Sequence, residues 1–320
     1  MRIEKNTLIN YHDDPDVTKL LIPPEVKKIA PHAFYGAEYL EEVVISDGVT
    51  EIGAEAFSGC HELRSVIMPD SVTEMGKKVF ADCHKLCDVR LSAGLYKIPE
   101  CTFDCCHSLV SIEIPEGVRI IGYDAFNSCI ALTSVSLPDS VNYIDNGAFM
   151  ETFSLKDITI PGFVEDIGAY TFFRSGVRHI HYRYMDIFLD RTEQNFDSIE
   201  FCFERGLHKW LREGCTGTVD FMPREMRYPF ISAHFAATRD PRTAEYIKKR
   251  FPALFGHMVR AGNIPAVRAV IEYGGFLSSR NINTYITHAA KQENKEIFLM
   301  LTAHKKQLGA YKNTNGRFRL

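Results

Sequence analysis

Three cysteine–histidine pairs carry the most obvious chemical potential in this sequence: Cys60-His61, Cys83-His84 and Cys106-His107. Thiolates and imidazoles bind zinc, and a thiol beside an imidazole base can act as a nucleophile. Side chains of neighbouring residues point in different directions, so a catalytic dyad within one pair is geometrically disfavoured. A zinc site would need the three imidazoles to converge on one ion at about 2.0 to 2.1 Å. Polar surface turns explain the histidines without a metal, and we expect them to line a ridge.

The cysteines of these pairs belong to a longer column that repeats every 23 residues. Its members are Cys60, Cys83, Cys106 and Cys129, with Ala37, Thr152 and Ser175 at the equivalent positions near its ends. Because Ala, Thr and Ser replace Cys there, the column indicates a small buried side chain. Column mates about 4.8 Å apart would suit a disulfide by distance, but parallel side chains in a ladder seldom reach its torsion. The chain has nine cysteines, an odd number that fits a reducing compartment.

Further candidates for chemistry lie outside the repeat. His179-x-His181 places two imidazoles on one strand face, an arrangement that needs no metal. The non-repeating middle of the chain offers four reactive side chains for an enzyme or a metal or redox sensor: His208, Cys202, Cys215 and Glu204. The sequence contains no glycine-rich phosphate loop, C-x-x-C pair, H-E-x-x-H motif or nucleophile elbow, which disfavours catalysis.

The element that must position these residues is a repeat marked by one phenylalanine every 23 residues. The column consists of Phe34, Phe57, Phe80, Phe103, Phe126, Phe149 and Phe172. Apolar residues also recur twelve, eight and five residues before each Phe, and leucines recur six residues after most of them. A fixed period of this length is typical of a solenoid, in which stacked units bury a continuous core.

Each unit predicts its own local structure. Segments such as Leu109-x-x-Ile112-x-Ile114 alternate apolar residues and predict a short strand with one buried face. Pro115 follows directly and ends the strand, because proline has no N–H for the ladder. The Ala-Phe segment predicts a short helical or tight-turn piece whose phenylalanine points inward.

The combined pattern I-P-x-x-V-x-x-I-x-x-x-A-F-x-x-C-x-x-L-x-x-V, which Ile114-Pro115 through Val135 fits at almost every position, resembles the BspA-like leucine-rich repeats. The resemblance implies an α/β repeat fold, a leucine-rich-repeat solenoid of about seven 23-residue coils. Proteins with these repeats are often surface or secreted interaction modules, and no catalytic residue belongs to the repeat.

The last third of the chain is predicted to be helical, with breaks at Pro229 and Pro241. His257 through Asn263 recurs 31 residues later as His288 through Asn294, and an apolar helix follows each copy. This pattern resembles degenerate ankyrin helix pairs, with a preceding half copy around residues 240–250. We therefore expect a small α-helical ankyrin-like domain after the solenoid.

These patterns divide the chain into five parts. We expect an N-terminal cap at 1–20, the solenoid at 21–180, a capping or bridging segment with a strand and an amphipathic helix at 181–229, the helical domain at 230–310 and a tail at 311–320. Within the cap, Val17-x-x-Leu20-x-Ile22 predicts the first strand of the ladder.

The outward-facing strand positions are where a partner-binding face would lie. The candidates are Glu42, Val44, Ser65, Ile67, Asp88, Arg90, Ser111, Glu113, Ser134, Ser136, Asp157, Thr159, His179 and His181. This row is either the ordinary solvated side of a sheet or a recognition face, because solenoids commonly bind through this surface. Val44 and Ile67 form its apolar pair.

Composition narrows the function classes. The 320 residues are 45% hydrophobic and 24% charged with a net charge of −4, and no basic stripe predicts nucleic-acid binding. No apolar run approaches the roughly 18 to 20 residues that span a bilayer, and residues 1–6 lack a signal-peptide core. We expect a cytoplasmic protein, or a surface or secreted one if a leader was removed. The sequence predicts a non-catalytic protein–protein interaction scaffold without a cofactor; the alternative is an enzyme or a metal or redox sensor with its site in 181–229.

Overall fold

The computed structural model describes residues 1–164, 166–168, 170–182, 185–188 and 224–315. The chain forms two compact units. The first contains Met1–Val177 and Asn195–Phe221, and the second contains Arg178–Gln194 and Met222–Leu320.

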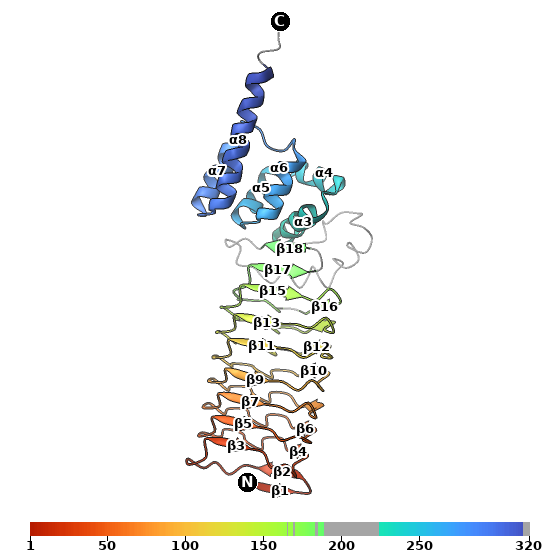
Figure 1. Cartoon of the computed structure of the whole chain (residues 1–320), viewed down its shortest axis with the longest axis vertical. Helices are drawn as coiled ribbons and strands as arrows, with labels where there is room; N and C mark the ends of the chain where they lie inside the picture. The colour runs from red at the N-terminus through yellow and green to blue at the C-terminus, as the bar shows by residue number, and fades with distance from the viewer. Residues whose placement is uncertain (165, 169, 183–184, 189–223, 316–320) are drawn as a thin grey trace. The chain divides into compact units, whose positions relative to one another are not determined.

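The first unit is a solenoid in which each coil contributes one longer and one shorter strand (Figure 1). The longer strands are β3 (Lys19–Leu21), β5 (Glu42–Val44), β7 (Ser65–Ile67), β9 (Asp88–Arg90), β11 (Ser111–Glu113), β13 (Ser134–Ser136) and β15 (Asp157–Ile160). β3, β5, β7 and β9 form a parallel sheet in which Leu21 pairs with Val44 and Val44 with Ile67, so the register repeats the 23-residue spacing. The predicted strands are confirmed because their central residues, such as Val43 and Val66, are buried.

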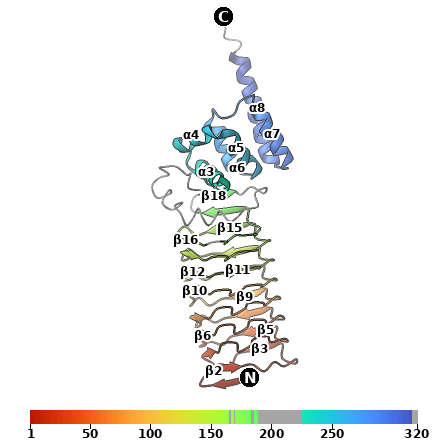
Figure 2. The ribbon, with the colours of Figure 1, turned by 180° about the vertical axis from the view of Figure 1, so that it is seen from behind.

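The shorter strands follow the turn after each longer strand. They are β4 (Lys28–Ile29), β6 (Glu51–Ile52), β8 (Glu74–Met75), β10 (Lys97–Ile98), β12 (Ile120–Ile121), β14 (Tyr143–Ile144) and β16 (Asp166–Ile167). They pair in parallel, and the second residue of each belongs to the predicted Ile/Met column. Figures 1 and 2 show the two strand sets on opposite sides of each coil, with the core between them.

The N-terminal cap contains a hairpin that the sequence analysis did not predict. β1 (Arg2–Glu4) and β2 (Thr7–Asn10) are antiparallel, and β2 pairs in parallel with β4 of the first coil. The turn residues Lys5 and Asn6 have φ of 47° and 61°, as a two-residue hairpin turn with left-handed residues requires. Leu8 of β2 is fully buried and extends the core. The first predicted ladder strand is confirmed as β3.

The phenylalanine ladder fills the core. All seven column members are at most 2% exposed, which confirms that they point inward. Successive rings stack with centroids 4.6 to 6.0 Å apart and planes within 16° of parallel. Offset stacking of this kind adds to the free energy gained by burying the rings.

The Ala-Phe segment is a turn with a left-handed residue on each side of the phenylalanine. The residue two positions before Phe has φ of 49° to 66° in every coil, and the residue two positions after has φ of 53° to 74°. Gly147, Gly36 and Gly59 occupy such positions, but most coils place a larger residue there. Left-handed backbone at non-glycine residues costs roughly 1 to 2 kcal/mol each, so packing must hold these turns in place.

The second unit begins with a hairpin of β17 (His179–Tyr182) and β18 (Met185–Phe188). The prediction that the apolar residues after Ile180 extend one strand is therefore wrong, because Ile180 pairs with Ile187 in an antiparallel ladder. The helices that follow in the described residues are α3 (Arg224–Thr238), α4 (Pro241–Lys249), α5 (Phe251–Arg260), α6 (Ile264–Tyr273), α7 (Ile282–Lys291) and α8 (Lys295–Asn315). α3 packs against β18.

The helices form three pairs with the same connecting turn. Asn263 and Asn294 cap α6 and α8, and each side-chain amide oxygen accepts a hydrogen bond from the backbone N–H three residues later, at 2.9 and 3.0 Å. Asp240 caps α4 in the same way, at 2.7 Å from the N–H of Thr243. The expected half copy at 240–250 is therefore the second helix of a complete pair with α3. This arrangement is compatible with ankyrin-like repeats.

The two predicted proline breaks have different outcomes. Pro241 occupies the first turn of α4, where its missing N–H is not needed, and it marks a helix start as expected. Pro229 lies inside α3, so the expected break there is wrong. It stands close enough to the first turn of α3 for the helix to continue through it.

Candidate functional site

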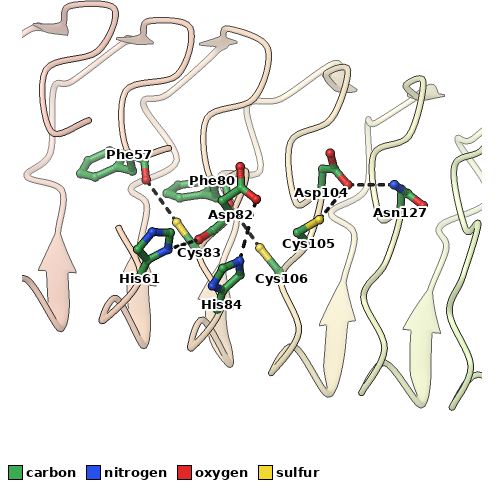
Figure 3. A network of polar contacts seen from close by, with 10 residues as sticks. All are labelled: Phe57, His61, Phe80, Asp82, Cys83, His84, Asp104, Cys105, Cys106 and Asn127. Carbon is green, nitrogen blue, oxygen red and sulfur yellow. Dashed lines mark hydrogen bonds and ion pairs between the residues drawn. The ribbon is translucent and has the colours of Figure 1, made fainter. Parts of the chain in front are cut away.

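The ladder cysteines are structural hydrogen-bond donors. Each Sγ donates to the carbonyl oxygen of the phenylalanine 26 residues earlier, at 3.1 to 3.2 Å. Figure 3 shows two of these bonds, from Cys83 to Phe57 and from Cys106 to Phe80. The side chains of the column are fully buried, which confirms the predicted small buried position.

Burial also keeps these thiols protonated. It raises the pKa of Cys60 to about 12, and it raises the pKa of Cys83 and Cys106 well above the ordinary value. Burial, helped by the nearby charge of Asp104, raises the pKa of Cys105 to about 11. Since the thiolate is the nucleophile and the metal ligand, these four residues are poorly suited to redox or zinc chemistry.

The three histidines that follow ladder cysteines form the predicted ridge. The His61, His84 and His107 rings stack with centroids 4.7 Å apart, and their planes lie within 14° of parallel. His61 Nδ1 donates to the backbone oxygen of Asp82 at 2.9 Å, and His84 Nε2 lies 3.8 Å from Asp82 Oδ1 (Figure 3). Burial lowers the pKa of His84, and the charges of His107 and His61 lower it further.

Stacked imidazoles direct their nitrogens in parallel and do not converge on one ion. Within the part of the chain that the structure describes, no group of three or more His, Cys, Asp or Glu side chains could hold a metal. The histidine ridge is thus a row of flat, partly exposed rings whose common protonation is opposed by mutual repulsion.

A buried carboxyl group lies beside the ridge. Asp104 Oδ1 accepts a hydrogen bond from Asn127 Nδ2 at 2.9 Å and one from Cys105 Sγ at 3.6 Å (Figure 3). Burial raises the pKa of Asp104, although these two hydrogen bonds oppose the shift. A raised carboxyl pKa is a mark of many general acids, but here the carboxylate joins neighbouring coils through an amide and a thiol.

The two strand histidines share a carboxylate that sequence reasoning missed. Asp186 Oδ1 lies 2.7 Å from His181 Nδ1 and 3.3 Å from His179 Nε2. Asp186 is on β18, directly opposite His181 in the register, so the pairing appears only once the hairpin is known. Burial opposes ionisation of Asp186, yet the hydrogen bond and charge of His181 lower its pKa.

The structure leaves all fourteen predicted face residues exposed or partly exposed. Two of them, His179 and His181, belong to the second unit, and the other twelve follow the longer strands of the solenoid. The apolar pair Val44 and Ile67 is 40% and 39% exposed. Leu21 extends this pair by one rung, since it is in register with Val44 and is 62% exposed.

Leu21, Val44 and Ile67 together form an apolar stripe on β3, β5 and β7. Sequence reasoning missed Leu21 because the face was counted from the first complete unit, although Leu21 stands 23 residues before Val44. Contiguous exposed apolar side chains on a soluble surface are typical of interaction sites.

Charged residues surround the apolar stripe. Lys19 pairs with Glu42 at 2.7 Å beside it, and Arg90 lies 3.7 Å from Asp70 at the next rung. Further along the same face, the exposed charges are acidic, at Glu113 and Asp157. The face therefore changes from apolar to acidic along the solenoid.

The candidates for an enzyme or sensor site, His208, Cys202, Cys215 and Glu204, lie outside the described residues. The amphipathic helix expected around Trp210 lies there too. In the described part of the chain, no helix combines the length and the apolar character needed to cross a bilayer.

Comparison with known proteins identifies the repeat. A family model described as a BspA type leucine-rich repeat region, with six copies, matches residues 10–129 and 76–186. A leucine-rich cell surface protein from Faecalibacterium prausnitzii is 29% identical over 58% of this chain and 54% of its own, with a TM-score of 0.49. A leucine-rich repeat protein from Eubacterium ventriosum is 26% identical over 54% of this chain and 46% of its own, with a TM-score of 0.51. A leucine-rich repeat protein from T. pallidum is 34% identical over 50% of this chain and 72% of its own, with a TM-score of 0.39.

The matched part spans about half the length of the first two of these proteins. No curated protein matches the chain. The comparisons do not support the expected cytoplasmic location, since the F. prausnitzii protein is described as a cell surface protein.

Proposed function

The chain belongs to the family of BspA-type leucine-rich repeat proteins, and from this membership we propose that it is a non-catalytic scaffold that binds another protein through the strand face of its solenoid. Leucine-rich repeat proteins typically mediate protein–protein interaction, and the outward strand residues of such a solenoid form an extended surface suited to it. The apolar stripe of Leu21, Val44 and Ile67 is the observation that carries the proposal.

The apolar stripe is suited to act as an anchor because it is rigid. Its three side chains stand on neighbouring strands of one sheet, whose backbone register holds them in line. A preorganised surface loses little conformational entropy on binding, so more of the burial energy is available for affinity. Full burial of one such side chain contributes about 1.5 to 3 kcal/mol, and these side chains already lie partly buried, so each could add roughly 1 kcal/mol.

The charges on the face indicate the partner's complementary surface. Glu113 and Asp157 make the distal part of the face acidic, so the partner would present basic residues there and apolar residues against the stripe. The same acidic character argues against nucleic acid, whose phosphates would be repelled. The proposal does not depend on the cellular compartment, because the strand face contains no thiol.

The alternative is an enzyme or a metal or redox sensor that uses residues 181–229. Its candidate side chains are outside the described residues, so no observed contact favours it. The described cysteines and histidines of the solenoid have structural partners, as their hydrogen bonds and ring stacking show.

Affinity capture with the intact chain tests the proposal. A Val44→Asp, Ile67→Asp double variant should lose a partner that the wild-type chain retains, while its melting temperature stays unchanged. Phe163→Asp is the matched control, because Phe163 is 72% exposed and lies outside the strand columns. Equal capture by the wild-type chain and the double variant would exclude the apolar stripe as the anchor.

A further inference from the structure

The helix pairs of the second unit stack on one another through a defined interface. Tyr285 of α7 packs edge-on against Phe255 of α5, with ring centroids 4.7 Å apart. Arg268 of α6 forms an ion pair with Glu296 of α8 at 3.3 Å. The α5–α6 pair therefore presents one face that the α7–α8 pair covers.

The 31-residue spacing transfers this face to the next pair. α5 and α7 begin 31 residues apart, and so do α6 and α8 with their Asn caps. Val267 and Arg268 of α6 correspond to Phe298 and Leu299 of α8. Positions that the next pair covers on α5–α6 thus have equivalents on α7–α8, the last pair among the described residues.

Those equivalent positions are apolar and exposed. Val267 is fully buried, whereas Phe298 is 36% exposed. Leu299 is 65% exposed where α6 carries the ion-paired Arg268. Together with Ala290 they line a groove of about 520 Å³ on the outer face of α7–α8, flanked by Glu293 and Lys295. The groove has the position of a pair-to-pair interface, and a terminal repeat with a polar outer face would not have it.

We propose that this outer face of α7–α8 binds the same face of a second copy of the chain. A helix pair is the element that covers the equivalent face within the protein, and a second copy supplies a helix pair of matching shape. The flanking charges are self-complementary, because a two-fold axis places Glu293 opposite Lys295 of the second copy and the reverse.

The other end of the helix array favours a closed dimer over a filament. α3 of the first pair packs against β18 within the same unit, so that end of the array is already covered. A head-to-tail contact would need both ends open, whereas a face-to-face contact needs only α7–α8. The inference does not rest on the proposed strand-face function.

Sedimentation velocity of the full chain from about 1 to 100 µM, a range that reports micromolar dissociation constants, tests the proposal. The wild-type chain should shift from monomer to dimer. Leu299→Glu should raise the dissociation constant at least about tenfold, because symmetry removes the side chain twice. Ile130→Glu, at an exposed apolar side chain of the solenoid, should leave the dimer unchanged.

A charge exchange gives a sharper test that does not depend on apolar contacts. Glu293→Lys alone and Lys295→Glu alone should each weaken self-association, because like charges then face each other. An equimolar mixture of the two variants should recover dimer, since each copy then meets opposite charges. A wild-type chain that stays monomeric throughout the range, or a dimer unaffected by Leu299→Glu, would overturn the proposal, including the case in which the face captures a helix of another protein.

Discussion

Replacing Phe103 by alanine tests the ladder at its centre. Phe103 is fully buried, and its ring stacks on Phe80 and Phe126 with centroids 5.7 and 5.3 Å away. Deleting a buried phenylalanine side chain costs about 3 to 5 kcal/mol. Because the ring loses a stacking partner on each side, we expect a loss in the upper part of that range. The cavity would open between two coils whose backbones are held by parallel strands, so little collapse can offset it.

Urea unfolding followed by circular dichroism measures this loss as a change in midpoint and free energy. Phe163→Ala is the control, since Phe163 is 72% exposed and an exposed substitution changes stability by less than about 0.5 kcal/mol. A loss below about 1 kcal/mol for Phe103→Ala would refute the ladder as the core of the solenoid.

A double-mutant cycle separates stacking from burial. Phe103→Leu and Phe126→Leu each retain an apolar side chain but remove the ring contact between these two residues. We expect a coupling energy of about 0.5 to 1.5 kcal/mol, the usual contribution of an aromatic pair beyond its buried area. A coupling near zero would show that burial alone accounts for the loss at Phe103.

Three further outcomes follow from the coil turns. Cys106→Ala removes the thiol donor to the Phe80 carbonyl and should cost about 1 to 2 kcal/mol in urea unfolding; in native protein, a thiol reagent should label the exposed Cys87 before Cys106. The lowered pKa of His84 means that the unfolded chain binds the proton more readily, so stability is present above the ordinary value of 6.5 and is lost as pH falls below it; His84→Asn should reduce the difference in melting temperature between pH 7.5 and 5.5, at conditions of about equal salt. Lys78 has φ of 57°, so Lys78→Gly should stabilise the chain by about 0.5 to 1 kcal/mol, and a destabilised variant would contradict the strain argument.

The inward columns could be predicted from sequence because each has one physical requirement. A position such as Phe103 or Val66 must be apolar in every coil, so the requirement is printed at every period. The strand pattern and the direction of the ladder follow from the same repetition. The small column of Cys60 was likewise recognisable, because residues of similar size replace it.

Features that occur once, or that join distant segments, could not be predicted. The β1–β2 hairpin has no copy elsewhere, and its Lys5-Asn6 turn lacks the glycine that usually signals one. Asp186 meets His181 only through an antiparallel register that residues 179–188 do not reveal by spacing. The α3–α4 pair escaped because its cap, Asp240, lies 23 residues before Asn263, whereas the recognised copy lies 31 residues after it.

The geometry of the coils also explains where partner choice must reside. At Gly53 and Gly76 an added Cβ would lie 2.3 Å from a backbone nitrogen of the preceding coil, so coil spacing fixes these residues. The outward strand positions carry no such demand, because Val44, Ile67 and Arg90 occupy one register with different side chains. The backbone ladder is thus indifferent to the outward residue, and selection by a partner can act there without loss of stability. Family membership therefore defines the scaffold, while the order of apolar and acidic side chains along the strand face determines which surface it can match.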